Sequence, residues 1–145
     1  MIDHADILLV EDNPNDIKLT LHAFQTANLA NPVTIARDGV EALDFVFCTG
    51  PYAGRRIEDA PKVILLDLKL PRIDGHEVLK RIKADPRTAT IPVVILTTSR
   101  EERDVLQSYE LGGNSYIIKP VDFEQFTQAV RDIGKYWLVL NHQRN

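Results

Sequence analysis

Short, mostly apolar runs alternate along the chain with longer segments in which apolar residues recur every three or four positions. Runs of four or five apolar residues are typical of strands that are buried on both faces, as the strands of a parallel sheet are. The runs that fit this description cover residues 7–10, 33–36, 63–66, 92–96 and 115–118. The pattern therefore predicts five strands.

The segments that follow these runs carry the spacing of amphipathic helices and begin at residues that cap helices well. The expected N-terminal caps are Asn13, Asp38, Asp74, Ser99 and Asp122. Gly50 is suited to end the second helix, because glycine readily adopts the left-handed conformation found there. The last helix is expected to extend over about residues 122–140.

Strands that alternate with helices in this way predict an α/β fold with a parallel sheet and helices on both faces. The chain has 145 residues, which is enough for one domain with a sizeable core. We therefore expect residues 1–145 to form a single doubly wound (βα)5 domain. The connection at residues 49–61 is longer than usual and contains two arginines.

Polar residues stand where four of the predicted strands end. They are Glu11 and Asp12 after the first strand, Asp67 after the third, Thr97 after the fourth and Lys119 after the fifth. Each has an ordinary structural explanation when it is taken singly. In a parallel sheet, however, the carboxyl ends of all strands lie at one edge, where ligands bind. The convergence of these residue types at that edge favours a functional site.

The charges of this group indicate its chemistry. Three carboxylates repel one another, and a hard divalent cation with oxygen ligands and bound water, such as Mg²⁺, relieves that repulsion. The metal and Lys119 bring the formal charge to −3 + 2 + 1 = 0, so that the site can accept a dianionic phosphoryl group. Carboxylates form covalent acyl phosphates, and Asp67 is the expected acceptor because it stands alone on the central strand.

Four motifs resemble the receiver domain of two-component response regulators. They are Leu8-Leu9-Val10-Glu11-Asp12-Asn13, Leu65-Leu66-Asp67-Leu68-Lys69-Leu70-Pro71 with Asp74-Gly75, Leu96-Thr97-Thr98, and Tyr116-Ile117-Ile118-Lys119-Pro120. They span nearly the whole chain in the order and spacing of that family. The resemblance implies a flavodoxin-like architecture with strand order 2-1-3-4-5.

The resemblance also implies a role for each residue of these motifs. Asp67 would take a phosphoryl group from a phosphohistidine on a sensor kinase. Asp12, Asp67 and the backbone carbonyl of Lys69 would bind Mg²⁺ directly, and Glu11 would bind it through water. Lys119 would pair with the phosphoryl oxygens. Thr97 would bond to one of them and move toward the site, and Tyr116 would rotate inward in response. Many receivers have Asp where Glu11 stands, so we expect a retained metal site with an altered affinity.

Composition narrows the possible partners and compartment. The net charge is −4 and the hydrophobic fraction is 44%, so a general nucleic-acid or anionic-membrane partner is not favoured. No run approaches the length of a transmembrane helix, and the acidic N-terminus does not resemble a signal peptide. The single cysteine, Cys48, fits a reducing cytoplasm.

The end of the last predicted helix is apolar around its whole circumference, where an ordinary surface helix has one apolar face. Trp137 continues the core stripe of this helix, and Tyr136, Leu138, Val139 and Leu140 add apolar residues around the rest of it. The candidate interface residues are Tyr136, Trp137, Leu138 and Leu140. This end either packs against its own domain or forms an interface between copies. We favour an interface between copies in a homodimer, and the sequence leaves open whether phosphorylation tunes its formation. No DNA-binding domain is expected to follow, so the output would be a protein contact or onward phosphotransfer.

The long connection before the third strand, the Thr97-Thr98-Ser99 run and the closing Tyr136-Trp137-Leu138 resemble single-domain regulators that partner bacterial phytochromes. The function expected is therefore that of a phosphoacceptor signalling protein, which catalyses only its own phosphorylation and dephosphorylation. Two alternatives remain: a flavodoxin-like cofactor binder and an interaction domain that works without phosphorylation. The acidic loop after the first strand argues against the former, because it would repel a phosphate unless a metal intervened.

Overall fold

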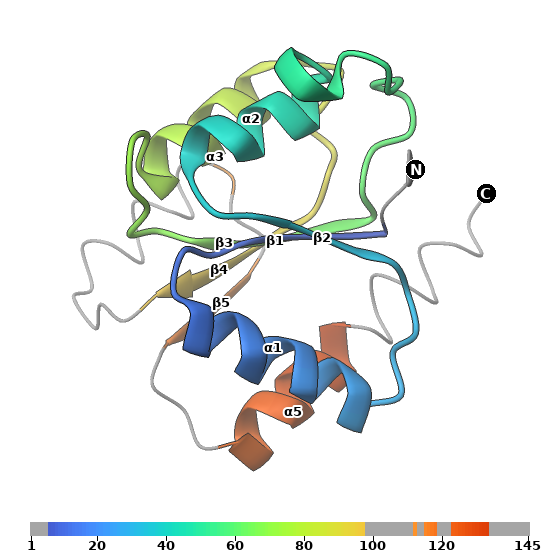
Figure 1. The fold of residues 1–145 in the computed structure, drawn as a ribbon, viewed down its shortest axis with the longest axis vertical. Coiled ribbons are helices and arrows are strands. Elements are labelled where there is room, and N and C mark those ends of the chain that lie inside the picture. The colour runs from blue at the N-terminus through green and yellow to red at the C-terminus, as the bar shows by residue number, and fades with distance from the viewer. Residues whose placement is uncertain (1–5, 98–111, 113–114, 119–122, 134–145) are drawn as a thin grey trace.

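The structure, a computed structural model, describes residues 6–97, 112, 115–118 and 123–133. Figure 1 shows a central sheet with α2 and α3 on one face and α1 and α5 on the other. This arrangement confirms the predicted α/β class, with a parallel sheet between helical layers.

All neighbouring strands in the sheet are parallel, and their order is β2-β1-β3-β4-β5. The strands are β1 (Ile7–Val10), β2 (Val33–Ala36), β3 (Val63–Asp67), β4 (Val93–Thr97) and β5 (Ser115–Ile118). The order agrees with the one that the sequence motifs implied. It places β1 and β3 side by side at the centre, with Val10 paired to Leu66.

The described helices are α1 (Pro14–Thr26), α2 (Gly39–Phe47), α3 (Gly75–Ala84) and α5 (Phe123–Ile133), and a short 3₁₀ turn, η1 (Gly50–Tyr52), follows α2. The helix expected from Ser99 and the end of the last helix lie outside the described residues. The prediction of five complete βα units is therefore tested only in part. No helix in the described ranges is long and apolar enough to cross a membrane.

Both faces of the sheet are buried, because helices cover each of them. Successive side chains of a strand point to opposite faces, so neighbouring residues enter different cores. On β1, Leu8 and Val10 belong to the core under α2 and α3, whereas Ile7 and Leu9 belong to the core under α1 and α5. Every residue of β3 is buried. The continuous apolar runs of the sequence therefore reflect the burial that a parallel sheet requires.

The described helices begin where the sequence predicted, but α2 ends at a different residue from the one expected. The Asp38 and Asp74 carboxylates accept the backbone N–H groups of Glu41 and Glu77 at 2.8 and 3.0 Å, which caps α2 and α3. The expectation that Gly50 ends α2 is wrong, because Cys48 takes the left-handed conformation, with φ 57°, directly after Phe47. Local hydrogen bonding closes this turn, since the Cys48 N–H donates to the Asp44 carbonyl.

Candidate functional site

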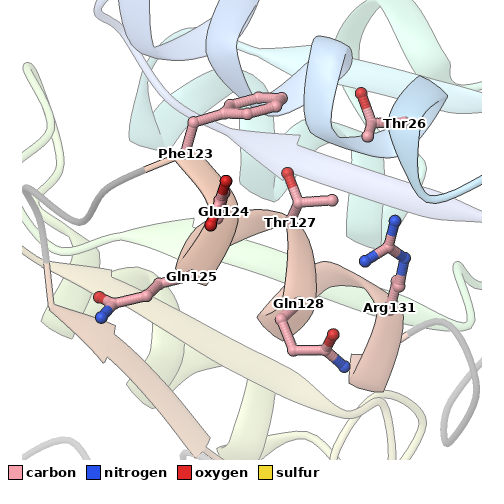
Figure 2. A pocket seen from close by; sticks show the side chains of 7 residues that line it. All are labelled: Thr26, Phe123, Glu124, Gln125, Thr127, Gln128 and Arg131. Carbon is pink, nitrogen blue, oxygen red and sulfur yellow. The ribbon is translucent and has the colours of Figure 1, made fainter.

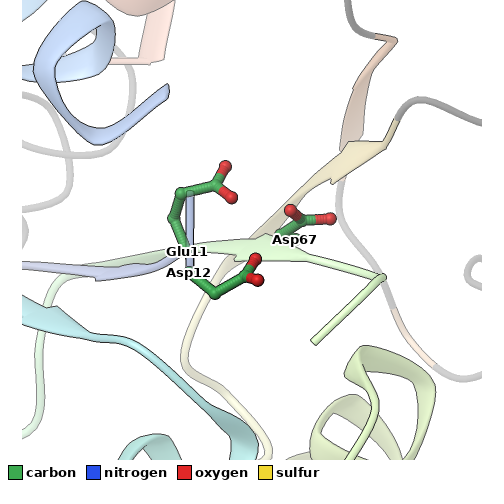
Figure 3. A group of neighbouring side chains, drawn as sticks. All are labelled: Glu11, Asp12 and Asp67. Atoms are coloured by element: carbon green, nitrogen blue, oxygen red, sulfur yellow. The ribbon is translucent and has the colours of Figure 1, made fainter. Parts of the chain in front are cut away.

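Three carboxylates lie together at the carboxyl ends of β1 and β3. Glu11 and Asp12 directly follow β1, and Asp67 is the last residue of β3. Because Val10 pairs with Leu66, the next residue of each strand comes to the same level of the sheet. One ligand oxygen from each of the three side chains lies within 4.8 Å of the others, and Figure 3 shows the carboxylates around a common space. This clustering is the one that the sequence predicted.

The cluster is buried on one side and open on the other. Glu11 is 1% exposed and Asp67 is 6% exposed, whereas Asp12 is exposed. Buried carboxylates at this separation interact more strongly than they would in water, because the local dielectric constant is lower. The cluster is therefore open to solvent on the side of Asp12.

Backbone groups fix the orientation of the buried carboxylates. The Lys69 N–H donates to Oδ1 of Asp67 at 3.0 Å, and the Asn13 N–H donates to Oε2 of Glu11 at 3.4 Å. Asn13 also caps α1, since its Oδ1 accepts the N–H groups of Asn15 and Asp16 at 2.8 and 3.1 Å. The start of α1 and the segment after β3 therefore hold the site from two sides.

Gly75 permits α3 to start directly against the end of β3. A Cβ at this position would lie 2.4 Å from the Asp67 carbonyl oxygen and 2.5 Å from the Leu68 Cα, closer than such atoms approach. The Gly75 N–H donates to the Leu68 carbonyl at 2.9 Å. The sequence motifs include this glycine, but nothing local in the sequence indicates that the end of a strand packs against it.

The structure describes some of the remaining predicted site residues, and others lie outside the described ranges. Lys69 lies two residues beyond Asp67 and donates its N–H to it. Thr97 ends β4 one residue after Leu96, which pairs with Asp67, and Tyr116 lies on β5 opposite Ile95. The residues that fall outside the described ranges are Lys119, Tyr136, Trp137, Leu138 and Leu140.

The donor set of the cluster fits a hard divalent cation. All three side chains offer carboxylate oxygens, which Mg²⁺ and Mn²⁺ prefer to nitrogen or sulfur. A divalent ion changes the formal charge of the cluster from −3 to −1. The exposed side at Asp12 leaves room for water, which Mg²⁺ retains in most protein sites.

A hollow of about 440 Å³ lies elsewhere, between α1 and α5. Figure 2 shows its lining, with Thr26 from α1 and the other side chains from α5. The lining includes none of the three carboxylates. Thr127 Oγ1 is buried there and has no hydrogen-bond partner among the described residues. This hollow is thus separate from the cluster at the strand ends.

Comparisons with known proteins agree with the geometry of the cluster. The family model described as the response regulator receiver domain matches residues 7–131. The response regulator Rcp1 of Synechocystis is 42% identical over 132 residues, which cover 91% of this chain and 88% of Rcp1. Its Mn²⁺-bound crystal structure superposes with a TM-score of 0.82 at 40% identity and covers 94% of this chain and 96% of that one.

Two further solved structures are similar over almost the whole chain. The phosphorylated cyanobacterial phytochrome response regulator RcpA has a TM-score of 0.83 and 43% identity, covering 94% of this chain and 95% of its own. The bacteriophytochrome response regulator AtBRR has a TM-score of 0.77 and 53% identity, covering 95% and 98%. These similarities show that the chain resembles regulators associated with phytochromes.

Proposed function

The chain belongs to the response regulator receiver domain family, and on that premise we propose that Asp67 accepts a phosphoryl group from a sensor histidine kinase. The observation that carries the proposal is the cluster of Glu11, Asp12 and Asp67, with ligand oxygens within 4.8 Å of one another. Asp67 is the acceptor because it ends the central strand, and its backbone neighbours hold it in place. The similar regulator RcpA has been solved in a phosphorylated form.

The proposed transfer is a displacement at phosphorus. The bond between phosphorus and the histidine nitrogen breaks as an Asp67 oxygen bonds to phosphorus, and the nitrogen keeps the electron pair and takes up a proton. Bound Mg²⁺ would supply the positive charge that a dianionic phosphoryl group needs beside carboxylates. Asp12, Asp67 and the Lys69 carbonyl would hold the ion directly, and Glu11 would hold it through water. The Mn²⁺-bound form of Rcp1 supports a divalent ion here.

The remaining roles complete the proposed switch. Lys119 would pair with the phosphoryl oxygens, and Thr97 would bond to one of them after phosphorylation. Tyr116 would then rotate inward and change the surface formed by β5 and α5. The places of Thr97 and Tyr116 on neighbouring strands β4 and β5 support this connection. The switch would modify only Asp67 and would not turn over another substrate.

The proposed donor is a phytochrome-type kinase. The names of the similar regulators RcpA and AtBRR associate both proteins with phytochromes. A donor of this type would make the chain an output of light sensing. The alternative, an interaction domain that works without phosphorylation, would use the same surfaces. A test of phosphorylation itself is therefore needed to distinguish the two functions.

Intact mass after incubation with acetyl phosphate and Mg²⁺ tests the acceptor. We expect one added phosphoryl group, lost in Asp67→Asn and after chelation of the metal. Asp12→Asn should slow the reaction while leaving the acceptor in place. An autophosphorylated phytochrome kinase in place of acetyl phosphate tests the donor, with a kinase of another sensor class as the control. Equal labelling of wild type and Asp67→Asn would contradict the proposal, and no labelling of either would favour the phosphorylation-independent alternative.

A further inference from the structure

The segment between β3 and α3 lies on the amino-terminal end of α2. We call residues 68–74 the metal loop, because the proposed function assigns a metal ligand to the Lys69 carbonyl. Within the loop, Arg72 has a φ of 70°, which residues other than glycine seldom adopt. Its neighbours must therefore hold the loop in this shape.

Gly39, the first residue of α2, is in direct contact with the metal loop. A Cβ at Gly39 would lie 2.0 Å from the Ile73 carbonyl oxygen and 2.7 Å from the Ile73 Cβ. The Gly39 N–H donates to the Pro71 carbonyl at 3.4 Å. Space rather than conformational freedom requires glycine here, since any side chain at this position would push the loop away.

Asp38 joins the same two segments through its carboxylate. Oδ1 accepts the Glu41 N–H at 2.8 Å and caps α2, while Oδ2 lies 3.4 Å from Nη1 of Arg72. The Asp38 side chain is 19% exposed and the Arg72 side chain is 62% exposed. One carboxylate therefore holds the start of α2 and the strained residue of the loop together.

Residues 36–39, the turn that connects β2 to α2, also contact the part of the site that follows β1. The Ala36 carbonyl, at the end of β2, accepts the Glu11 N–H at 2.9 Å. The chain from Ala36 to Gly39 thus contacts both Glu11 and the loop that carries Lys69. Asp38 and Gly39 themselves are not part of the carboxylate cluster.

We propose that Asp38 and Gly39 are positioning residues, which hold the metal loop so that the Lys69 carbonyl faces the carboxylate cluster. That the Lys69 carbonyl is a metal ligand rests on the proposed function. The new element is that residues 36–39, before α2, hold this carbonyl in position before the metal binds. Outer residues that orient metal ligands typically change metal affinity by about 10- to 100-fold when they are replaced.

Arg72→Gln gives the sharpest test, because positioning and simple electrostatics predict opposite results. Loss of a positive charge near an acidic site should tighten Mg²⁺ binding through the general field. Loss of positioning should weaken it, by about threefold for a half-exposed ion pair. Titration calorimetry with Mg²⁺ measures the difference. Arg81→Gln is the matched control, because it removes the same charge from an exposed ion pair between two side chains of α3, Arg81 and Glu77.

Asp38→Asn and Gly39→Ala complete the series. Asn keeps the helix cap but loses the charge that pairs with Arg72, and the added methyl of Ala displaces the Ile73 carbonyl. We expect about threefold weaker Mg²⁺ binding in Asp38→Asn and tenfold or more in Gly39→Ala. Thermal unfolding of the metal-free variants checks that each is folded, and the two side-chain variants carry the test if Gly39→Ala does not fold.

Hydrogen exchange of the Lys69 amide provides a readout that needs no metal. This amide donates to Asp67 Oδ1 at 3.0 Å, so displacement of the loop should speed its exchange in metal-free Arg72→Gln relative to Arg81→Gln. Equal Mg²⁺ affinity and equal Lys69 exchange in these two variants would overturn the proposal. If wild type binds no Mg²⁺, the proposed function fails, and the exchange rates still decide whether the turn positions the loop.

Discussion

Lys83 is a half-buried lysine that joins three parts of the chain. From the last turn of α3, its Nζ donates to the carbonyls of Ala89 at 3.0 Å and Ile91 at 2.6 Å in the connection to β4. A Cβ on Gly112 would lie 2.9 Å from Lys83 Cγ, so the lysine stem also packs beneath that glycine. Burial lowers the pKa of the Lys83 ammonium. A lysine in solvent would have neither these two hydrogen bonds to carbonyls nor a pKa lowered by burial.

Replacement of Lys83 by methionine tests this role. We expect the free energy of unfolding to fall by about 1–3 kcal/mol, because two carbonyls lose their donor. The lysine pKa is lower in the folded protein than its ordinary value of 10.5. Between the folded-state pKa and 10.5, the unfolded chain binds more protons at this lysine than the folded protein does. Wild-type stability therefore rises as the pH increases through that range. The difference between wild type and Lys83→Met in urea unfolding should therefore widen toward alkaline pH. A difference that stays constant with pH would count against the assignment.

At the scale of the element, the carboxyl end of α2 is closed by a buried arginine from the long connection that follows. Arg55 is 8% exposed. It donates to the Phe45 carbonyl and, at 2.9 Å, to the Asp59 carbonyl, and its guanidinium lies over the Phe45 ring. A positive charge at a helix carboxyl terminus interacts favourably with the helix dipole. Arg55 therefore anchors the connection to α2.

Arg55→Met should lower the free energy of unfolding by about 2–4 kcal/mol, because two carbonyls lose a charged donor. The neighbouring Arg56 provides the matched control, since its side chain is 73% exposed and pairs only at the surface with Glu58. We expect Arg56→Met to change stability by about 0.5 kcal/mol or less. Urea unfolding followed by circular dichroism measures both. Equal effects of the two substitutions would contradict the buried anchor.

At the scale of the whole molecule, the apolar carboxyl-terminal end remains the predicted interface between two copies. Residues 134–145 lie outside the described ranges. In α5 the buried residues include Phe126 and Val130, which face the core shared with α1. The interface prediction therefore rests on the sequence pattern of Tyr136, Trp137, Leu138 and Leu140.

Trp137→Glu should convert the predicted homodimer to a monomer, because a charge replaces an aromatic anchor in an apolar interface. We expect the dimer dissociation constant to rise by about tenfold or more, measured by sedimentation velocity with and without acetyl phosphate. Gln143→Glu introduces the same charge in the same segment and should leave the dimer intact. An oligomer that Trp137→Glu does not change would exclude Trp137 from the interface.

Local patterns along the chain were enough to predict the class of fold and the carboxylates at the centre of the site. Buried parallel strands require continuous apolar runs, and capped helices require particular residues at their first positions, so both leave local signals. Because parallel strands end at one edge, the sequence also determined that Glu11, Asp12 and Asp67 meet there. The arrangement of these strands and carboxylates follows from regular geometry.

The contacts that hold the site in place, in contrast, join segments that are distant in the sequence. Gly39 must be glycine because the Ile73 carbonyl lies against it, and Arg55 is buried because two carbonyls and an aromatic ring receive it. Cys48 takes the left-handed turn that the sequence assigned to Gly50. Each of these features depends on a packing contact or a hydrogen bond that the local sequence pattern does not specify. Local sequence thus specifies the elements, and packing between them specifies the shape of the loops that complete the site.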